Sequence, residues 1–438
     1  MVPSATVRRL LACGLAILGA CVPTAPRDRA YVSDAIQERT GAATGDASRV
    51  EPTAAPNVRV DDGVTEDEAV RMALWNNAEL HATLEDLGFA RAELYRAGAL
   101  PNPTLSTFLP LGPKQWEFTI AWAIDWLWGR PYRVAAASLD MERVAEELVA
   151  RGVEVARDAR VAHANVVLAE RQDVLAREAA KAWDAIAHLA RVRRAAGAAS
   201  LLEVNAVETD ARAAKIEADR RTLLVRAAHA RLREVLGAED VVEVIPPTGA
   251  ATVTASLEEL EKVALAARPE VRAAELAVEA AGERAGWEVA RIFQLIGQLD
   301  FNAQGFAGGP EAGPGLILTI PLFDQNQAGR TRVDAELRAA SWRYIGVRQR
   351  ILREVAEAYA ALTIAKTTRE RWPADVLEPL ERNVELATHA YEAGGASYLA
   401  VLDANRRRIE AKQREAELFA EERRALAELA RSVGRMPE

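Results

Sequence analysis

The residues that could do catalytic or metal chemistry are few and widely scattered in this 438-residue chain. It holds two cysteines, both before residue 22, five histidines and four methionines. No two histidines lie within five positions of each other, so no pair has the local spacing of a metal site. The body of the chain therefore has neither a catalytic thiol nor a cysteine-bound zinc. Gly-x-Ser-x-Gly, Walker, dinucleotide-binding and His-Glu-x-x-His motifs are also missing from the sequence. We expect neither an enzyme nor a resident cofactor or metal.

Cys21 is the residue with the clearest chemical setting. Arg8 and Arg9 precede an apolar run at residues 10–20. This run is shorter than the roughly 20 residues of a membrane-spanning helix and is typical of a secretory signal. It ends in Leu-Gly-Ala-Cys, which resembles the bacterial lipobox. The resemblance implies that residues 1–20 are a signal peptide and that the thiol of Cys21 is lipidated. The alternative is an ordinary signal peptide with a chance cysteine.

The segment that follows Cys21 is rich in proline, alanine, threonine, aspartate and arginine and has weak periodicity. We interpret residues 21–63 as a lipidated, extended tether, and the alternative is a disordered leader without a specific role. Val22 stands where an aspartate would oppose sorting to the outer membrane in the enteric pattern. The lipobox resemblance therefore implies the outer membrane as the location of the anchor.

The charge balance excludes one large class of partner. The chain carries 55 Lys and Arg against 64 Asp and Glu, a formal net charge of −9. A nucleic-acid-binding protein would carry a basic excess, so no nucleic-acid partner is expected. After residue 20 no apolar run reaches 18 residues. If the protein crosses a membrane, it must therefore do so with strands.

The body of the chain repeats one pattern twice. TEDEAVRMALWNNAELHA at residues 65–82 matches SLEELEKVALAARPEVRA at residues 256–273, and each opens with a capping box that predicts a helix start. Two further matches follow in the same order, a Thr-Ile pair and a Gly-x-Ala-Ser turn. We therefore predict a duplicated unit, with residues 64–245 as the first repeat and residues 246–434 as the second.

Each repeat is predicted to contain a helix, a strand region, and two long helices joined by a glycine turn. Between Pro131 and Ala196 there is no proline and one glycine, Gly152. About 65 helical residues would extend roughly 100 Å, more than a globular core requires. Pro373 and Pro379 predict a kink in the corresponding helix of the second repeat. A plain coiled coil is the alternative for these helices.

The strand regions alternate strictly between large apolar and small or polar side chains. Period two places the large groups of the first repeat on one face of a strand. They are Trp116, Phe118, Ile120, Trp122, Ile124, Trp126 and Trp128. Tryptophan enrichment is typical of a membrane interface, so we predict that this face meets lipid. A soluble sheet packed on a core is the alternative.

Turn-like segments within both strand regions predict two hairpins, and therefore four strands per chain. A four-stranded sheet in hydrocarbon would leave the backbone groups of both edges unpaired, at several kcal/mol per group. Such a sheet requires an oligomer that closes it into a barrel.

These features together resemble the TolC-type outer-membrane efflux factors, over residues 65–434. The motifs that carry the resemblance are TIPLFDQNQAGR at 319–330, YEAGGASYLAVLDANRR at 391–407, RRAAGAASLLEVNAVETDAR at 193–212 and ALPNPTL at 99–105. The first repeat departs from the family at its strand-to-helix junction, where IAWAIDWLWGRPYR replaces a Pro-Leu-Phe-Asp stretch.

The resemblance implies an α+β membrane protein that assembles as a homotrimer. Four strands per chain would form a transmembrane β-barrel, and the long helices would form an α-helical barrel across the periplasm. It also implies three partners: a periplasmic adaptor protein, an inner-membrane pump of the RND type, and outer-membrane lipid. The implied function is a passive exit duct for small molecules or metal cations.

Four residues are candidates for the helix-tip turns. Gly197 and Gly394 would let the chain reverse, while Ser200 and Ser397 would cap the next helix. The resemblance implies that these turns dock on the adaptor, and the alternative is that they are only turns.

Two acids are candidates for the narrow end of the tunnel. The resemblance places Asp403 there, where three copies would form a negative ring that favours cations. An ion pair with Arg407, one helical turn away, is the alternative. Glu203 lies on the counterpart helix, where it also completes a capping box with Ser200. Ala400 replaces an acid that is common in the family.

Two other functions remain open at this point. The chain could be the outer-membrane component of a type I protein secretion system, which the sequence does not separate from efflux. It could also be a lipid-anchored periplasmic coiled-coil scaffold without a pore. A scaffold would not need seven large apolar groups in a period-two row.

Overall fold

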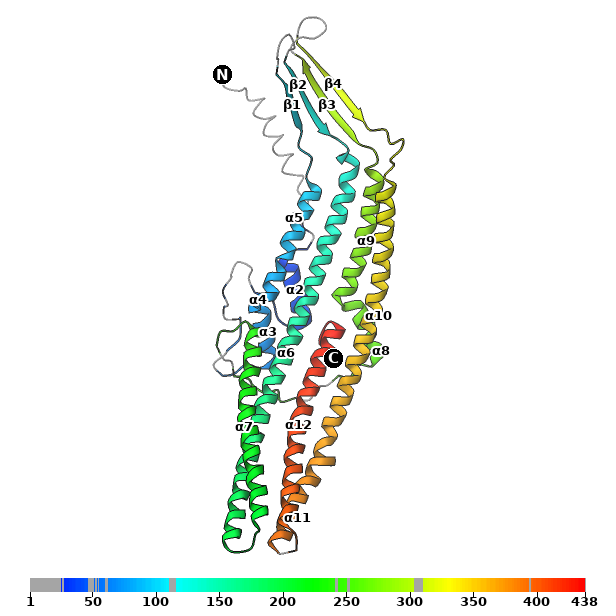
Figure 1. Ribbon diagram of the computed structural model, residues 1–438. Helices are drawn as coiled ribbons and strands as arrows, with labels where there is room; N and C mark the ends of the chain where they lie inside the picture. Colours follow the sequence, from blue (N-terminus) through cyan, green and yellow to red (C-terminus); the bar gives the residue numbers. More distant parts are fainter. Residues whose placement is uncertain are drawn as a thin grey trace. The chain divides into compact units, whose positions relative to one another are not determined.

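The computed structural model describes residues 25, 27–45, 51, 53, 55–59, 62–109, 116–240, 243–249, 253–302, 310–393 and 395–437 (Figure 1). The chain divides into two compact units. Residues 1–32, 83–148 and 269–349 form the unit that contains the β-sheet, here called the sheet unit. Residues 33–82, 149–268 and 350–438 form the unit that contains the helix turns, here called the tip unit. The predicted signal peptide and Cys21 lie outside the described residues.

Both predicted capping boxes are present. Helix α3 (Glu66–Asn76) begins after Thr65, whose hydroxyl accepts a hydrogen bond from the backbone N–H of Glu68 at 3.3 Å. Helix α8 (Leu257–Ala267) begins in the same way after Ser256, with Glu259 as the partner. The hydrogen bond from Thr65 lowers the pKa of Glu68, and the backbone N–H of Ser256 lowers the pKa of Glu259. Both carboxylates therefore stay ionised at helix N-termini, where negative charge is favourable.

The single helix predicted at the start of the first repeat is three helices. After α3 the chain forms α4 (Ala78–Leu84) and α5 (Asp86–Gly98). The first break falls at Asn77, whose side chain accepts from the N–H of Leu80 at 2.9 Å. This local bond offers the backbone an alternative to the helix. In the second repeat the break lies between α8 and α9 (Pro269–Ala290), because the residue before a proline avoids helical geometry.

The uninterrupted long helix of the first repeat is confirmed. Helix α6 (Trp126–Ala195) runs for 70 residues, and α7 (Leu201–Leu236) follows it. Its glycine at position 152 has a structural reason. A Cβ atom there would lie 2.4 Å from Cδ1 of Ile36, so only glycine admits this side chain.

Ile36 belongs to a helix that corrects the predicted extended tether. Residues 21–63 are not extended throughout, because α2 (Arg29–Thr40) forms within them. Val32 and Ile36 on this helix are both 0% exposed. These two apolar residues, four positions apart, share one helix face, which is too short a pattern to predict a helix amid so many polar residues.

The predicted kink of the second repeat is a π-helical turn. Helix α10 (Gln327–Trp372) ends at η1 (Pro373–Leu377), after which α11 (Glu378–Glu392) and α12 (Tyr398–Val433) complete the chain. The N–H of Glu378 bonds to the carbonyl of Pro373, five residues back. Pro373 lacks an N–H donor and its ring crowds the preceding turn, so the helix widens here.

Four strands form one antiparallel sheet in the order β1-β2-β3-β4, as Figure 1 shows. They are β1 (Thr104–Phe108), β2 (Glu117–Ala123), β3 (Leu295–Asn302) and β4 (Glu311–Leu318). Strand β2 of the first hairpin pairs with β3 of the second, so one sheet unites them. The predicted number of strands is confirmed.

Burial is concentrated in the helices. The largest fully buried apolar side chains include Leu94, Met141 and Leu276 in the sheet unit, and Leu74, Leu80, Leu232, Leu236, Ile351, Leu418 and Leu429 in the tip unit. Within the four strands no side chain reaches this degree of burial. The helices therefore hold the core, and the sheet extends from it.

Candidate functional site

The register of the sheet gathers apolar side chains on one of its faces. Directly opposed residues of neighbouring strands share a face, and one such row contains Leu105, Ile120, Leu299 and Pro314. The neighbouring rows add Phe118, Phe301, Trp122 and Leu316. These side chains remain exposed, from 36% for Trp122 to 72% for Leu316. An uncovered apolar face of this kind marks an interaction surface.

The opposite face of the sheet is more polar, although Phe108, Ile296 and Ile317 also lie on it. One row contains Ser106, Thr119 and Asp300, and the next contains Thr104, Ala121 and Gln298. Alternation along each strand separates the two faces, as period two requires. The sheet is therefore amphipathic across its thickness.

The strand prediction holds for the centre of the tryptophan-rich segment. Phe118, Ile120 and Trp122 lie within β2, with Trp116 and Ile124 directly beyond its ends. The rings of Trp116 and Phe118 stack with centroids 6.2 Å apart. These contacts extend the apolar face to the ends of the strand.

The prediction is wrong for Trp126 and Trp128, which lie in the first turn of α6. The chain turns at Asp125, whose carbonyl accepts from the N–H of Gly129 at 3.2 Å. In a helix, side chains two positions apart point about 200° apart, so these two tryptophans cannot share a face. The ring of Trp126 is 6.0 Å from that of Trp122, whereas Nε1 of Trp128 donates to the carbonyl of Ala290 on α9.

The first helix turn of the tip unit has the predicted geometry, whereas the side-chain cap predicted for Ser397 is not formed. Gly197 has φ +73°, the left-handed conformation that favours glycine. The hydroxyl of Ser200 accepts from the N–H of Glu203 at 3.1 Å and caps α7. Ser397 stands at the N-cap of α12 without a side-chain capping bond. Gly394 lies outside the described residues.

The two helix hairpins of the tip unit contact each other near these turns. Ala187 of α6, Val207 of α7 and Leu402 of α12 form a buried apolar cluster. Arg193 of α6 hydrogen-bonds the hydroxyl of Tyr391 on α11, and its guanidinium lies 5.1 Å from that ring. The sequence did not point to this contact, because its two residues lie almost 200 positions apart.

The two predicted acids lie on this pair of hairpins but are not brought together by any contact. Asp403 accepts from Nε of Arg407 at 2.8 Å and from a guanidinium nitrogen of Arg406 at 3.1 Å. The ion pair with Arg407 considered from the sequence is therefore present. Glu203 is half-buried in the first turn of α7, beside Ser200.

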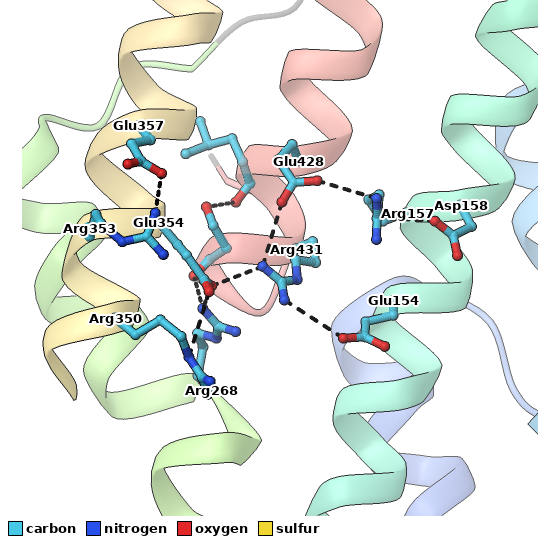
Figure 2. Close-up of polar contacts among 12 residues, drawn as sticks. Glu154, Arg157, Asp158, Arg268, Arg350, Arg353, Glu354, Glu357, Glu428 and Arg431 are labelled. Carbon is cyan, nitrogen blue, oxygen red and sulfur yellow. Dashed lines mark hydrogen bonds and ion pairs between the residues drawn. The ribbon is translucent and has the colours of Figure 1, made fainter. Parts of the chain in front are cut away.

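A buried network of ion pairs in the tip unit could not be read from the sequence. Glu354 of α10 accepts from Arg268 at 2.6 Å and from Arg431 at 2.9 Å (Figure 2). Arg431 of α12 also lies 3.7 Å from Glu154 of α6. We call these four residues, Arg268, Glu354, Arg431 and Glu154, the ion-pair belt. They join α6, α10, α12 and the end of α8, elements of both predicted repeats.

Electrostatics within the belt favour the ionised carboxylate. Burial alone would raise the pKa of Glu354, but the hydrogen bond from Arg268 and the charges of Arg268 and Arg431 lower it. The Arg268 side chain is only 1% exposed, so it depends on this partner.

A second buried polar cluster surrounds His163 on α6. Its Nε2 donates to the carbonyl of Val64 at 3.0 Å, and burial lowers the pKa of the ring. Glu66 nearby pairs with Arg160 and Arg423. The charged groups are paired and a neutral imidazole donates to a carbonyl, which is the pattern of a structural cluster.

Two kinds of feature are absent from the described residues. No group of three or more His, Cys, Asp and Glu side chains there is arranged to hold a metal ion. No helix in the same part of the chain is long and apolar enough to cross a membrane.

Known proteins are similar to this chain in sequence and in fold. The profile of a family described as outer membrane efflux protein matches residues 260–435. This part of the chain is therefore similar to the outer membrane efflux protein family. Outer membrane protein OprJ of Pseudomonas aeruginosa is 28% identical over 435 residues, covering 89% of this chain and 87% of OprJ.

A second relative and a solved structure are also similar to this chain. The cobalt-zinc-cadmium resistance protein CzcC of Cupriavidus metallidurans is 23% identical over 384 residues, covering 85% of this chain and 90% of CzcC. Among solved structures, CusC has a TM-score of 0.74 at 19% identity, covering 88% of this chain and 98% of that one. The fold of the chain is therefore that of these channels.

Proposed function

We propose that the protein is the outer-membrane exit duct of a tripartite efflux system, through which small molecules or metal cations leave the cell envelope passively. The similarity of residues 260–435 to the outer membrane efflux protein family supports this proposal. The similarity to CzcC, a protein named for cobalt, zinc and cadmium resistance, supports metal cations as one class of cargo.

The observation that carries the proposal is the amphipathic sheet. Phe118, Ile120, Trp122, Leu299 and Leu316 form an exposed apolar face, whereas the opposite face is more polar. Leaving such a face in water is unfavourable, at roughly 25 cal/mol for each Å² of apolar surface. Contact with lipid on one side and with an aqueous lumen on the other accounts for both faces. A periplasmic scaffold would have no use for this division.

A homotrimer would complete the membrane-spanning part. Strands β1 and β4 are the outer strands of the sheet, and hydrocarbon offers no water to an exposed strand edge. In the proposed trimer β4 of one copy pairs with β1 of the next, so that twelve strands close into a barrel. The two repeats, residues 64–245 and 246–434, would each contribute one hairpin, which is consistent with a gene duplication.

The tip unit would form the periplasmic end of the duct. In this proposal the turns at Gly197, Ser200, Gly394 and Ser397 dock on a periplasmic adaptor, which connects the channel to an inner-membrane RND-type pump. Asp403, with Glu203 on the counterpart helix, would provide negative charge at the narrow end. Because Arg406 and Arg407 pair with Asp403, a ring at this level would be partly neutralised.

The N-terminus would be held in the outer membrane by lipid. In the proposal residues 1–20 are removed as a signal peptide, and Cys21 is acylated. The first described helix, α2, begins eight positions after Cys21. The anchor would therefore be close in sequence to the folded body.

Native mass measurement tests the proposal. Protein is extracted with detergent from carbonate-washed outer membranes, and the mass of the particle is determined. We expect a carbonate-resistant trimer of roughly three 47.5-kDa chains, less the signal peptide. A monomer or dimer released by carbonate would overturn the membrane assignment.

Genetic context separates efflux from type I protein secretion. A proton-driven pump and an adaptor encoded beside this gene are expected for efflux, and deletion of the gene should then sensitise cells to the cargo. An ABC exporter as the only neighbouring partner would contradict the efflux assignment.

A further inference from the structure

The hydrogen bonds of the sheet determine which backbone groups its two outer strands turn outward. In an antiparallel ladder, directly opposed residues alternate between pairs that exchange hydrogen bonds and pairs that do not. The N–H of Ile124 donates to the carbonyl of Leu295, so the odd-numbered residues of β3 bond to β2. The N–H of Thr319 donates to the carbonyl of Gln294, so the even-numbered residues of β3 bond to β4. These two bonds fix the alternation across all four strands.

On β1 the alternation turns Leu105 and Thr107 outward. The even-numbered residues of β2 bond to β3, so its odd-numbered residues bond to β1. There they lie opposite Thr104, Ser106 and Phe108. The backbone N–H and C=O groups of Leu105 and Thr107 therefore point away from β2. Because β1 is an outer strand of the described sheet, these groups lie at its edge.

The outer edge of β4 lacks one hydrogen-bond donor. The odd-numbered residues of β4 bond to β3, so its even-numbered residues face outward. They are Ala312, Pro314, Leu316 and Leu318. Proline has no backbone N–H, so it is tolerated at an outward position, where it removes no bond to β3. The edge of β4 therefore presents N–H groups with a gap at Pro314.

Three registers would place both outward residues of β1 opposite outward residues of β4 in a second copy. The partner of Thr107 can be Ala312, Pro314 or Leu316, and Leu105 then faces the residue two positions later. In the first two registers a carbonyl of β1 meets Pro314 and receives no hydrogen bond. Such a carbonyl is costly in hydrocarbon, because no water replaces the missing donor.

We propose that β4 of one copy pairs with β1 of the next in the third register, in which Thr107 lies opposite Leu316. Leu105 then lies opposite Leu318, and the outward groups of both β1 residues have partners. The side chains of the four residues share the apolar face of the sheet, as direct pairing requires. This inference rests on the trimer of the proposed function and names the residues that meet at its seams. Pro314 excludes the two competing registers.

The same register gives the strands the tilt of a closed barrel. Within one chain, the row of opposed residues that starts at Leu105 crosses the sheet to Pro314. In the proposed seam Leu105 of the next copy faces Leu318 instead, four residues along β4. Three seams shift the ladder by twelve residues over twelve strands. At about 3.3 Å per residue and about 4.8 Å between strands, this shift corresponds to a tilt of about 35°.

The other two registers give tilts that do not fit a membrane barrel, whose strands are tilted by roughly 35–45°. Pairing of Leu105 with Leu316 halves the shift and gives a tilt of about 19°. Pairing of Leu105 with Pro314 gives no shift, and therefore no tilt. Hydrogen bonding and barrel geometry thus favour the same register by separate arguments.

Disulfide trapping in the full-length, membrane-extracted protein tests the register. Ser106→Cys is combined with Ile317→Cys, Gly315→Cys or Thr319→Cys, on the face opposite Leu105. Within one chain β1 and β4 are three strand spacings apart, about 14 Å, so only two copies can be joined. The proposed register places Ser106 opposite Ile317. Mass spectrometry of the linked peptides identifies each disulfide.

We expect the pair with Ile317→Cys to form disulfides at about fivefold the yield of the other two, because a shift of two residues moves the Cα atoms beyond the roughly 7 Å that a disulfide bridges. The highest yield with Gly315→Cys or Thr319→Cys in an intact trimer would overturn the register and leave the proposed function standing. Absence of all three disulfides would overturn the seam, and a monomer by native mass would then overturn the proposed trimer as well.

Proline substitutions test the hydrogen bonds of the seam. Leu316→Pro removes the N–H that is proposed to bond to Thr107. Ala312→Pro removes an outward N–H that lies beyond the end of β1 in this register, and neither N–H bonds to β3. We expect Leu316→Pro to lower the yield of carbonate-resistant trimer severalfold, whereas Leu316→Ala and Ala312→Pro should largely keep it. Equal losses in the two proline variants would contradict the proposed seam.

Discussion

Glu354 shows how single buried charges hold the tip unit together. It accepts hydrogen bonds from Arg268 and Arg431, and Arg268 is almost completely buried. Replacing the carboxylate would remove a counter-charge from Arg268, whereas Arg431 would keep Glu154 and Glu428. The desolvation already suffered by Arg268 would then be uncompensated.

We therefore expect Glu354→Gln to destabilise the protein by about 3 kcal/mol in denaturant unfolding. Glu357→Gln, on the same helix but in an exposed pair with Arg353, is the matched control and should cost little (Figure 2). Equal losses in the two variants would mean that the belt contributes no more than a surface pair.

Glu354 also predicts a dependence of stability on pH. Its pKa is lowered in the folded state, so its stabilising effect is complete above the ordinary carboxyl value of about 4.5 and is lost as pH falls through the folded value. Between pH 6 and pH 3, about the range of that titration, the melting temperature should fall more steeply in the native protein than in Glu354→Gln.

His163 predicts a second pH effect, at higher pH. Burial lowers its pKa below 6.5, so the folded state binds fewer protons than the unfolded state. The stability that this histidine adds is complete above 6.5 and is lost as pH falls through the folded value. His163→Gln keeps a donor for the carbonyl of Val64 but cannot titrate.

The melting temperature of His163→Gln should therefore change less between pH 7 and pH 5, roughly the range of a histidine, than that of the native protein. Replacing the exposed His188 by glutamine is the control. If the melting temperatures of both variants fall with pH as steeply as that of the native protein, the titrating group is not His163.

At the scale of elements, the contact of α2 with α6 depends on Gly152. Alanine is the better helix former by up to about 1 kcal/mol, but its Cβ would overlap the side chain of Ile36. Overpacking costs about 1–3 kcal/mol, so Gly152→Ala should destabilise the native protein.

The effect of Gly152→Ala on stability should change sign when the side chain of Ile36 is shortened. In an Ile36→Ala background, Gly152→Ala should stabilise, because the overlap is gone and helix propensity remains. A double-mutant cycle in urea measures this coupling. Additive effects would show that α2 does not pack at Gly152.

The elements that could be predicted from the sequence are those whose signals are local. Thr65 with Glu68, and Ser256 with Glu259, marked helix starts that the structure contains. The alternation of large apolar with small or polar residues predicted which side chains of β2 share a face, and Pro373 predicted the irregular turn of the helix.

The features that were predicted wrongly, or not at all, depend on contacts between residues that are far apart in the sequence. Trp126 and Trp128 continued the alternation of β2, yet the chain turns at Asp125 and a helix begins. Only the carbonyl of Ala290, from the other repeat, gives Trp128 its partner. Helix α2 requires the space that Gly152 leaves for Ile36. The ion-pair belt joins residues as distant in the sequence as Glu154 and Arg431, which no local pattern connects.

At the scale of the whole molecule, the two faces of the sheet should respond differently to charge. On the proposed function Trp122→Asp places a carboxylate in lipid and should block assembly into carbonate-resistant trimers. Thr119→Asp places the same charge on the polar face and should assemble normally. Native gels of washed membranes distinguish the two, and normal assembly of both variants would exclude lipid from the apolar face.

The uncovered sheet also constrains the order in which the molecule is made. A newly exported single copy presents an adhesive apolar surface and two free strand edges, which are the features that drive misassociation in water. The helices can fold at once, since they contain their own core. On the proposed function, a holding chaperone would have to shield the strands during transit, and the sheet would be the last part to mature, when the three copies of the proposed trimer meet at the bilayer.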